Sequence, residues 1–415
     1  MKTQKNYLAP FITMVFLFLI VGFLTVVFQQ FQKPLQSAFL SNVGKIKTTL
    51  TVMVTFAWFL AYPLTGGVGA KWVDTIGHKK TLGRALIIMV AGLVVCSASA
   101  WLGAKSGSTI GVIPIGFFVF LTGVFIVGAA ATIMQVILNP YIAASEVPGT
   151  NAITRLAIGG SANSIGTTLA PFFVSGIVFG GVIAEKVKID QVIVPFLIMA
   201  ITIAVIAFVV HRLNLPNIAG TTNEGGGVLK KSIWSFSHVR LGVIGLFAYT
   251  GCEVSIGANI ILHANWLGGS FAEKATWMTT LYWGGLLLGR LIGSTLNKIP
   301  AQIQLTVTTI GATLLVLASI FTGNLWLLAC VGLFHSILWP GIFSLSINKL
   351  GKYTPKGAGV LMIGVAGGAV IPLIQGMLVD AMGKDWTWSW LIVVAGELYI
   401  LYYALSGCKV KQSGE

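Results

Sequence analysis

The sequence predicts an all-α membrane protein of about twelve transmembrane helices in two pseudo-symmetric bundles of about six each. Composition is the first observation: of 415 residues, 56% are hydrophobic and only 9% are charged, whereas a soluble protein carries roughly a quarter charged residues. The second is a succession of apolar runs, each near the roughly 20 residues that span a bilayer. The third is one long polar stretch halfway along the chain. A soluble protein is therefore excluded.

The apolar runs divide evenly between the two halves of the chain. The first-half helices are predicted at 10–32, 48–72, 82–102, 110–141, 152–179 and 192–212. The second-half helices are predicted at 241–263, 275–296, 303–321, 325–345, 358–382 and 388–405. This order predicts an N-terminal bundle over 1–213, a linker over 214–236 and a C-terminal bundle over 237–415. The linker is polar and rich in Gly, which is typical of a flexible connection. Bundle, linker and bundle is the layout of a transporter whose halves rock about a central site.

The net charge of +15 is explained by membrane topology, without a nucleic-acid partner. Most Lys and Arg residues lie in alternate short loops, and positive charge marks cytoplasmic loops. We therefore expect both termini in the cytoplasm of a multi-pass protein. The four Cys residues lack the spacing of a metal site or a disulfide framework, so we expect small core residues.

The loop between the second and third predicted helices combines one acid, Asp74, with the basic pair Lys79 and Lys80. Such a loop can act as a gate, in which Asp74 holds one conformation through a cation or a helix end. The alternative is a solvated positive-inside loop. The stretch Gly69–Lys80 resembles the conserved loop G-x-x-x-D-R-x-G-R-K of the major facilitator superfamily, with Thr75 and His78 at two positions where Arg is usual.

Two consecutive helices narrow the resemblance. Met-Gln-Val-Ile-Leu-Asn-Pro-Tyr at 134–141 and the run from Arg155 to Pro171 are similar to the signature of the fucose permease and glucose/galactose permease branch. Gly367 to Gly376 in the second half resembles the same branch. The resemblance implies the major facilitator fold and a secondary transporter of a monosaccharide or small saccharide, of glucose, galactose or fucose type. It further implies alternating access, a bacterial inner membrane and a monomer, with the lipid bilayer and a sugar as partners.

Sugar recognition needs amides for hydroxyl groups and aromatic faces for C–H surfaces. Polar side chains inside apolar helices are costly, so they mark functional positions by default. The predicted substrate-binding residues are Gln29, Gln32, Gln135, Asn139, Asn163, Asn259, Trp283, His335, Trp339 and Gln375. The fifth-helix Gln of the family pattern is replaced by Gly160, which leaves room for a bulkier ligand.

Several of these residues have structural alternatives. Hydrogen bonding between helices would also explain Gln135, Asn139 and Asn163. Trp283 could serve packing alone, and His335 could be a packing donor. Three tryptophans resemble an interfacial aromatic belt and are left outside the site: Trp386, Trp388 and Trp390.

Coupling of sugar transport to a proton would depend on acids inside the predicted helices, which are Glu253 and Glu397. A buried carboxylate can gain and lose a proton near neutral pH, and Glu253 is the leading candidate; a structural ion pair is its alternative. Gln29 stands where the first helix of many relatives carries an Asp, and an amide cannot ionise. The coupling ion is left open between H⁺ and Na⁺, with no other cofactor and no metal. Arg290 joins Asp74 as a gating candidate.

An enzyme would carry a nucleophile with a base, a metal cluster or a phosphate-binding loop, and the sequence indicates none of these. Transport is the predicted function, with cation-coupled uptake first. A uniporter or an exporter of another polar small molecule is the alternative.

Overall fold

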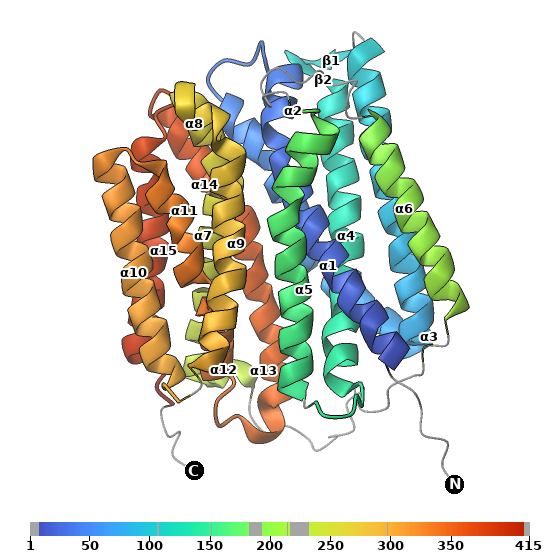
Figure 1. Ribbon diagram of the computed structural model, residues 1–415, viewed down its shortest axis with the longest axis vertical. Coiled ribbons are helices and arrows are strands. Elements are labelled where there is room, and N and C mark those ends of the chain that lie inside the picture. Colours follow the sequence, from blue (N-terminus) through green and yellow to red (C-terminus); the bar gives the residue numbers. More distant parts are fainter. Residues whose placement is uncertain are drawn as a thin grey trace. The chain divides into compact units, whose positions relative to one another are not determined.

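The structure is a computed structural model that describes residues 8–105, 108–150, 152–181, 193–213, 215, 232–296 and 298–410 (Figure 1). The described chain is helical apart from one hairpin of two short strands. This confirms the predicted all-α membrane fold. Within the described residues, 9 helices are long and apolar enough to cross a membrane.

The chain divides into two compact units, and each is described by itself. The first contains 1–43 and 60–224, and the second contains 44–59 and 225–415. The predicted linker over 214–236 lies mostly outside the described residues, so the predicted domain bounds stay a prediction.

The elements of the first unit are α1 (Leu8–Gln30), α2 (Gln32–Phe39), most of α3 (Lys47–Lys105), β1 (Thr109–Ile110), β2 (Ile113–Pro114), α4 (Ile115–Ala144), α5 (Ala152–Phe172), η1 (Phe173–Val178) and α6 (Ile193–Arg212). Those of the second unit, besides the start of α3, are η4 (Ile233–Ser235), α7 (Ser237–Leu267), α8 (Gly269–Glu273), α9 (Ala275–Thr295), α10 (Ala301–Thr322), α11 (Leu325–His335), α12 (Leu338–Ser346), η5 (Gly351–Tyr353), α13 (Thr354–Leu361), η6 (Met362–Ala366), α14 (Gly367–Ala381), η7 (Thr387–Trp390), α15 (Leu391–Tyr402) and η8 (Tyr403–Gly407).

Every predicted apolar run coincides with a helical element or a succession of them. The runs 48–72 and 82–102 are the two arms of α3, which turns at Gly77 with φ 79° and ψ 166°, a left-handed backbone that favours glycine. The nine spanning helices count α3 once and leave out α5 and α9, both of which are interrupted by Gly, Ser and Thr.

Two predicted boundaries are wrong, each because of a proline. The first helix was expected to run to residue 32, but α1 ends at Gln30 and α2 follows. Pro34 has no N–H to donate to the carbonyl of Gln30, so the helical ladder is interrupted there. The fourth helix was expected from residue 110, but the hairpin of β1 and β2 occupies 109–114. Pro114 disfavours a helical conformation at the residue before it, and α4 begins immediately after it.

Small residues bring α1 and α5 into close contact inside the first unit, where the two helices run side by side (Figure 1). A Cβ built on Gly166 would lie 2.2 Å from the backbone oxygen of Leu19, and one on Gly22 would lie 2.4 Å from that of Asn163. Membrane helices associate through such close packing, because lipid offers no hydrophobic driving force between them. This close packing fixes α1 and α5 relative to each other, and with them the positions of Gln29 in α1 and Asn163 in α5.

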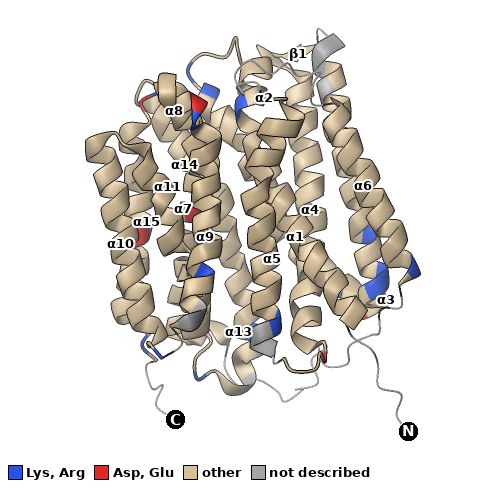
Figure 2. Ribbon diagram, in the orientation of Figure 1, with Lys and Arg blue, Asp and Glu red and all other residues tan. Residues whose placement is uncertain are grey.

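Charged residues collect at the helix ends, as the sparse charge predicted (Figure 2). The exceptions in the second unit are Glu253 in α7, Arg290 in α9 and Glu397 in α15. Burying an ionisable group in a membrane helix is costly without a partner, so these three positions call for one.

Candidate functional site

Gln29 is the first unit's clearest candidate for a ligand contact. Its side chain is 2% exposed, and neither its Oε1 nor its Nε2 has a hydrogen-bond partner in the described part of the chain. A buried amide without partners costs free energy, and native proteins rarely leave one so. Gln32, beyond the break at Phe31, is also fully buried, so the two side chains belong to α1 and α2 and not to one continuous helix.

Gln135 is oriented by a neighbouring helix. Its Nε2 donates to the hydroxyl oxygen of Tyr62 in α3 at 2.6 Å. Asn139, one turn later in α4, donates from Nδ2 to the backbone oxygen of Gln135 at 3.2 Å. Both side chains are half-buried. Their substrate role stays a prediction.

Asn163 has a contact that suits the structural alternative. Its Nδ2 donates to the backbone oxygen of Phe18 in α1 at 3.0 Å, and it lies against Gly22 at the α1–α5 crossing. By contrast, a Cβ on Gly160 would have no atom within 4 Å. The space that the sequence predicted beside Gly160 is therefore open, while Asn163 ties two helices together.

The second unit brings two predicted residues together. Asn259 in α7 donates from Nδ2 to Oε1 of Gln375 in α14 at 2.9 Å, and Gln375 donates from Nε2 to Oγ of Ser389 at 3.2 Å. Both amides are fully buried. The Oδ1 of Asn259 has no partner among the described residues, so it presents an acceptor that is already oriented by Gln375.

Two tryptophans that the sequence assigned to the membrane interface, Trp386 and Trp390, pack around His263, which lies one turn after Asn259 in α7. Trp390 donates from Nε1 to Nδ1 of His263 at 2.9 Å, and the ring of Trp386 stacks on His263 with centroids 6.1 Å apart. Trp390 is 1% exposed. The interfacial assignment is therefore wrong for Trp386 and Trp390, because their rings complete the packing around a buried imidazole. For Trp388, which is 49% exposed, the interfacial assignment stays a prediction.

Trp283 in α9 presents an unused donor. Its indole Nε1 has no hydrogen-bond partner within the described chain, and the ring packs directly on α7, where a Cβ on Gly257 would lie 2.3 Å from it. Any larger residue at 257 would displace the indole. The arrangement fixes the ring and leaves its N–H for another group, so packing alone does not satisfy this side chain.

Glu253 is held as one member of a polar group. Tyr249, one turn earlier in α7, donates its hydroxyl to Oε1 of Glu253 at 2.9 Å. Arg290 of α9 is close enough to interact electrostatically with the same carboxylate. The predicted Trp339 packs its ring against Tyr249, with centroids 6.3 Å apart. The coupling candidate and a gating candidate of the sequence therefore belong to one cluster.

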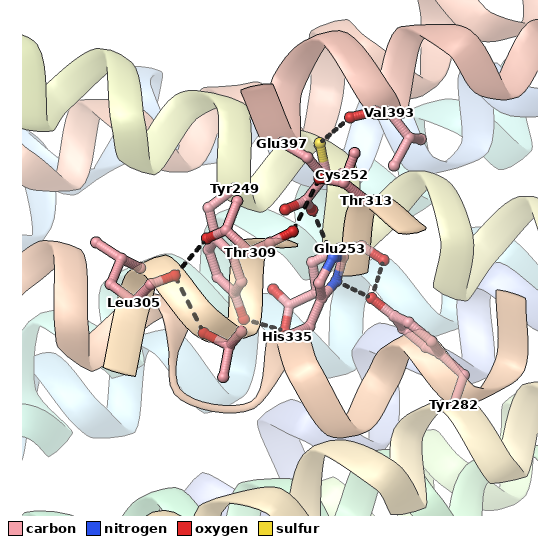
Figure 3. A network of polar contacts seen from close by, with 11 residues as sticks. Tyr249, Cys252, Glu253, Tyr282, Leu305, Thr309, Thr313, His335, Val393 and Glu397 are labelled. Carbon is pink, nitrogen blue, oxygen red and sulfur yellow. Dashed lines mark hydrogen bonds and ion pairs between the residues drawn. The ribbon is translucent and has the colours of Figure 1, made fainter. Parts of the chain in front are cut away.

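His335 lies at the centre of a second chain of contacts (Figure 3). Its Nδ1 is 2.8 Å from the hydroxyl of Tyr282, and its Nε2 is 2.7 Å from Oε1 of Glu397. Tyr282 also donates to the backbone oxygen of Glu253 at 3.0 Å. These bonds orient His335 toward Glu397, the acid that the sequence ranked second. The predicted contact between His335 and the substrate therefore has no support in the geometry.

The gating candidate Asp74 is exposed near the end of the first arm of α3. His78, just past the turn at Gly77, is buried and packs edge-on against Tyr141 with ring centroids 5.9 Å apart. This contact anchors the loop to α4. The gating roles of Asp74 and Arg290 stay predictions.

Sequence reasoning missed five residues of these clusters: Tyr62, Tyr249, His263, Tyr282 and Ser389. Helical spacing could have found two of them, since Tyr249 precedes Glu253 by four residues and His263 follows Asn259 by four, which places each pair on one face. No spacing connects Tyr282 to His335, which come from separate helices. Within the described chain there is no group of three or more His, Cys, Asp or Glu residues that could hold a metal ion.

Comparison with known proteins gives a consistent result. No protein-family model matches the chain. The glucose/galactose transporter of Brucella abortus is 30% identical over 416 residues, covering 98% of this chain and 96% of the relative. The L-fucose-proton symporter of Haemophilus influenzae is 24% identical over 409 residues, covering 91% of this chain and 90% of the relative. The crystal structure of the major facilitator superfamily transporter FucP in the outward conformation has a TM-score of 0.68 at 20% identity, covering 97% of this chain and 99% of that one.

The helical membrane fold and the relatives, which are named as transporters, define a multi-pass membrane transporter. With the similarity to the Brucella protein along almost the whole chain, the protein belongs to the major facilitator superfamily, in the branch of the glucose/galactose transporters and fucose-proton symporters. The family resemblance drawn from the sequence motifs is confirmed.

Proposed function

We propose that this protein carries a hexose of the glucose or galactose type into the cell by alternating access, driven by the proton gradient. The observation that carries the proposal is the 30% identity to a glucose/galactose transporter over 98% of the chain. It is supported by the chemistry of the buried side chains, which combine amides with an indole as a sugar requires.

The sugar contacts that we propose come first from groups without protein partners. Gln29 offers an acceptor and two donors, Asn259 offers an acceptor, and Trp283 offers a donor. A hexose has hydroxyl groups at its rim that would satisfy them, and apolar C–H faces that pack on an indole. Gln32, Gln135, Asn139, Gln375 and Trp339 are proposed as further contacts.

Proton coupling is proposed because one relative is named as a proton symporter. Sodium, which the sequence left open, gains no support from the relatives. Two acids lie inside the helices of the second unit, Glu253 and Glu397, and either could bind the proton; Glu253 is the candidate that the sequence placed first. We place the protein in a bacterial inner membrane as a monomer with cytoplasmic termini.

The test is sugar uptake by the purified protein in proteoliposomes. Labelled D-glucose, D-galactose and L-fucose are offered with an inward proton gradient, with no gradient, and with a protonophore. We expect glucose or galactose to accumulate above its external concentration only with the gradient, and protein-free liposomes provide the baseline.

Each other outcome identifies an alternative. Uptake that reaches equilibrium but ignores the gradient would make the protein a uniporter. Extrusion driven by an opposite gradient would make it an exporter. Failure to move any of the three sugars would reject the proposed substrate class.

A further inference from the structure

We propose that the transported proton is held between His335 of α11 and Glu397 of α15, with Tyr282 of α9 as the residue that positions the imidazole. The inference rests on the proton-coupled transport proposed above. Both members of this pair are 0% exposed, and the distance of 2.7 Å between His335 Nε2 and Glu397 Oε1 is that of a charge-assisted hydrogen bond.

The tautomer of His335 follows from its neighbour. A tyrosine hydroxyl has one proton to donate, and Tyr282 directs it to the backbone oxygen of Glu253, which can only accept. Toward Nδ1 of His335, at 2.8 Å, the hydroxyl oxygen must therefore accept (Figure 3). Nδ1 then carries a hydrogen in every protonation state of the ring that preserves this contact.

With Nδ1 protonated, the short contact between Nε2 of His335 and Oε1 of Glu397 requires a second proton between these two atoms. A neutral ring would turn the Nε2 lone pair toward a carboxylate lone pair at 2.7 Å, which is repulsive. One proton removes the conflict, either as imidazolium and carboxylate or as imidazole and carboxylic acid. The two forms have the same total charge, so the geometry is that of a pair loaded with one exchangeable proton.

The charged neighbours of this pair differ in how many partners they have. On the α7 side, Glu253 accepts from Tyr249 and interacts electrostatically with Arg290 of α9 and with His335. Cys252, also in α7, donates its thiol to the backbone oxygen of Val393.

The remaining neighbours add no competing charge. The α10 helix, packed on both α11 and α15, carries no ionisable side chain. In η8, the hydroxyl of Tyr403 is engaged with Ser346. No cation other than His335 contacts Glu397 within the described chain.

Loss of the proton would be linked to rearrangement. The second oxygen of Glu397, Oε2, has no hydrogen-bond partner among the described residues. Deprotonation would leave a buried carboxylate facing the imidazole lone pair on one oxygen and nothing on the other, a state that is strongly unfavourable without water. Release therefore requires the helices around the pair to admit water, which couples the proton to conformation.

The first experiment compares accumulation with exchange in proteoliposomes containing labelled D-galactose. Exchange between sugar on the two sides needs no proton release, whereas accumulation does. We expect Glu397→Gln to exchange within about twofold of wild type, because folding and binding are intact, and to lose accumulation entirely. Glu146→Gln, at an exposed acid, is the matched control and should accumulate normally. Loss of accumulation in Glu253→Gln but not in Glu397→Gln would overturn the assignment.

The second experiment reads the proton without sugar. Infrared difference spectra of the purified protein between acid and alkaline buffer should contain carboxyl and imidazole bands that vanish in Glu397→Gln and in His335→Gln but persist in Glu253→Gln. Unchanged bands in both variants of the pair would refute the proposal. If wild type moves no sugar, the proposed function fails while this measurement still decides where the proton binds.

Tyr282→Phe separates positioning from packing. Without the hydroxyl, the neutral ring can place its hydrogen on Nε2 and donate to Glu397, which stabilises the unloaded pair. We expect the imidazole band of His335 in the infrared difference spectrum to move, because the hydrogen of the neutral ring changes from Nδ1 to Nε2. An unmoved imidazole band would contradict the assigned tautomer.

Discussion

Truncating Asn259 tests the proposed sugar contacts most directly. In Asn259→Ala, the sugar loses the acceptor Oδ1, and Gln375 loses the donor that orients its Oε1. One lost neutral hydrogen bond is about 0.5–1.5 kcal/mol, and a poorly oriented second amide adds a similar amount. The total of about 1–3 kcal/mol corresponds to about a 5- to 150-fold loss of affinity.

Stability should change far less than affinity. Hydrogen bonds between membrane helices average about 0.6 kcal/mol, so the folded protein is expected to survive the truncation. The assay measures binding of labelled D-glucose and D-galactose to purified protein, and thermal unfolding of the same samples without sugar. A large change in the first quantity with a small change in the second is the expected signature.

Gln302 provides the matched control. Its Nε2 donates to the backbone oxygen of Ala404 at 2.8 Å, so Gln302→Ala also removes one amide contact between helices of the second unit. We expect the same small loss of stability and unchanged sugar affinity. Affinity in Asn259→Ala within twofold of wild type, or an equal loss in Gln302→Ala, would refute the reasoning.

Four further substitutions and one control test the helix packing, one helix cap and the proposed substrate site. Gly166→Val would force a side chain into the α1 backbone, because even a Cβ at this position would lie 2.2 Å from the backbone oxygen of Leu19. We expect the free energy of unfolding to fall by about 1–3 kcal/mol, which lowers the unfolding temperature. Gly160→Ala, in open space, should leave the unfolding temperature unchanged, and equal effects of the two substitutions would contradict this reasoning. Asp380→Ala removes the carboxylate that accepts from the first N–H groups of α3, and the loss of about 0.5–2 kcal/mol is measured the same way. Gln135→Ala should weaken uptake without lowering the unfolding temperature, whereas Asn163→Ala should lower both; uptake near normal in each variant would remove them from the site.

The architecture could be predicted from the sequence because the bilayer imposes one strong constraint. A chain inside lipid must satisfy its backbone internally, so long apolar runs become helices, and all the predicted runs did. The errors occurred at Pro34, where a missing N–H interrupts the helix, and at Pro114, which disfavours a helical conformation at the residue before it. A proline can be read directly from the sequence, but the hydropathy profile that located the helices does not register its effect on a helix boundary.

The site was harder to predict, because hydropathy does not say which helices are neighbours. Asn259 and Gln375 were each identified as polar residues in apolar surroundings, but their mutual hydrogen bond depends on the packing of α7 against α14. The sequence ranked Glu397 below Glu253, because nothing in it connects Glu397 to its partner His335, which is 62 positions away. Trp390 looked interfacial because nothing in the sequence places His263 beside it.

The single helix α3 belongs to two units, and this has a mechanical consequence. Residues up to 59 group with the second unit and residues from 60 with the first, while Asp380 holds the first turn through the backbone N–H groups of Thr48 and Thr49. Pro63 cannot donate to the carbonyl of Phe59, so the helical ladder is weakest at this boundary. The turn between Phe59 and Pro63 is therefore the part of this arm of α3 that bends most easily, whereas the first turn is held by Asp380.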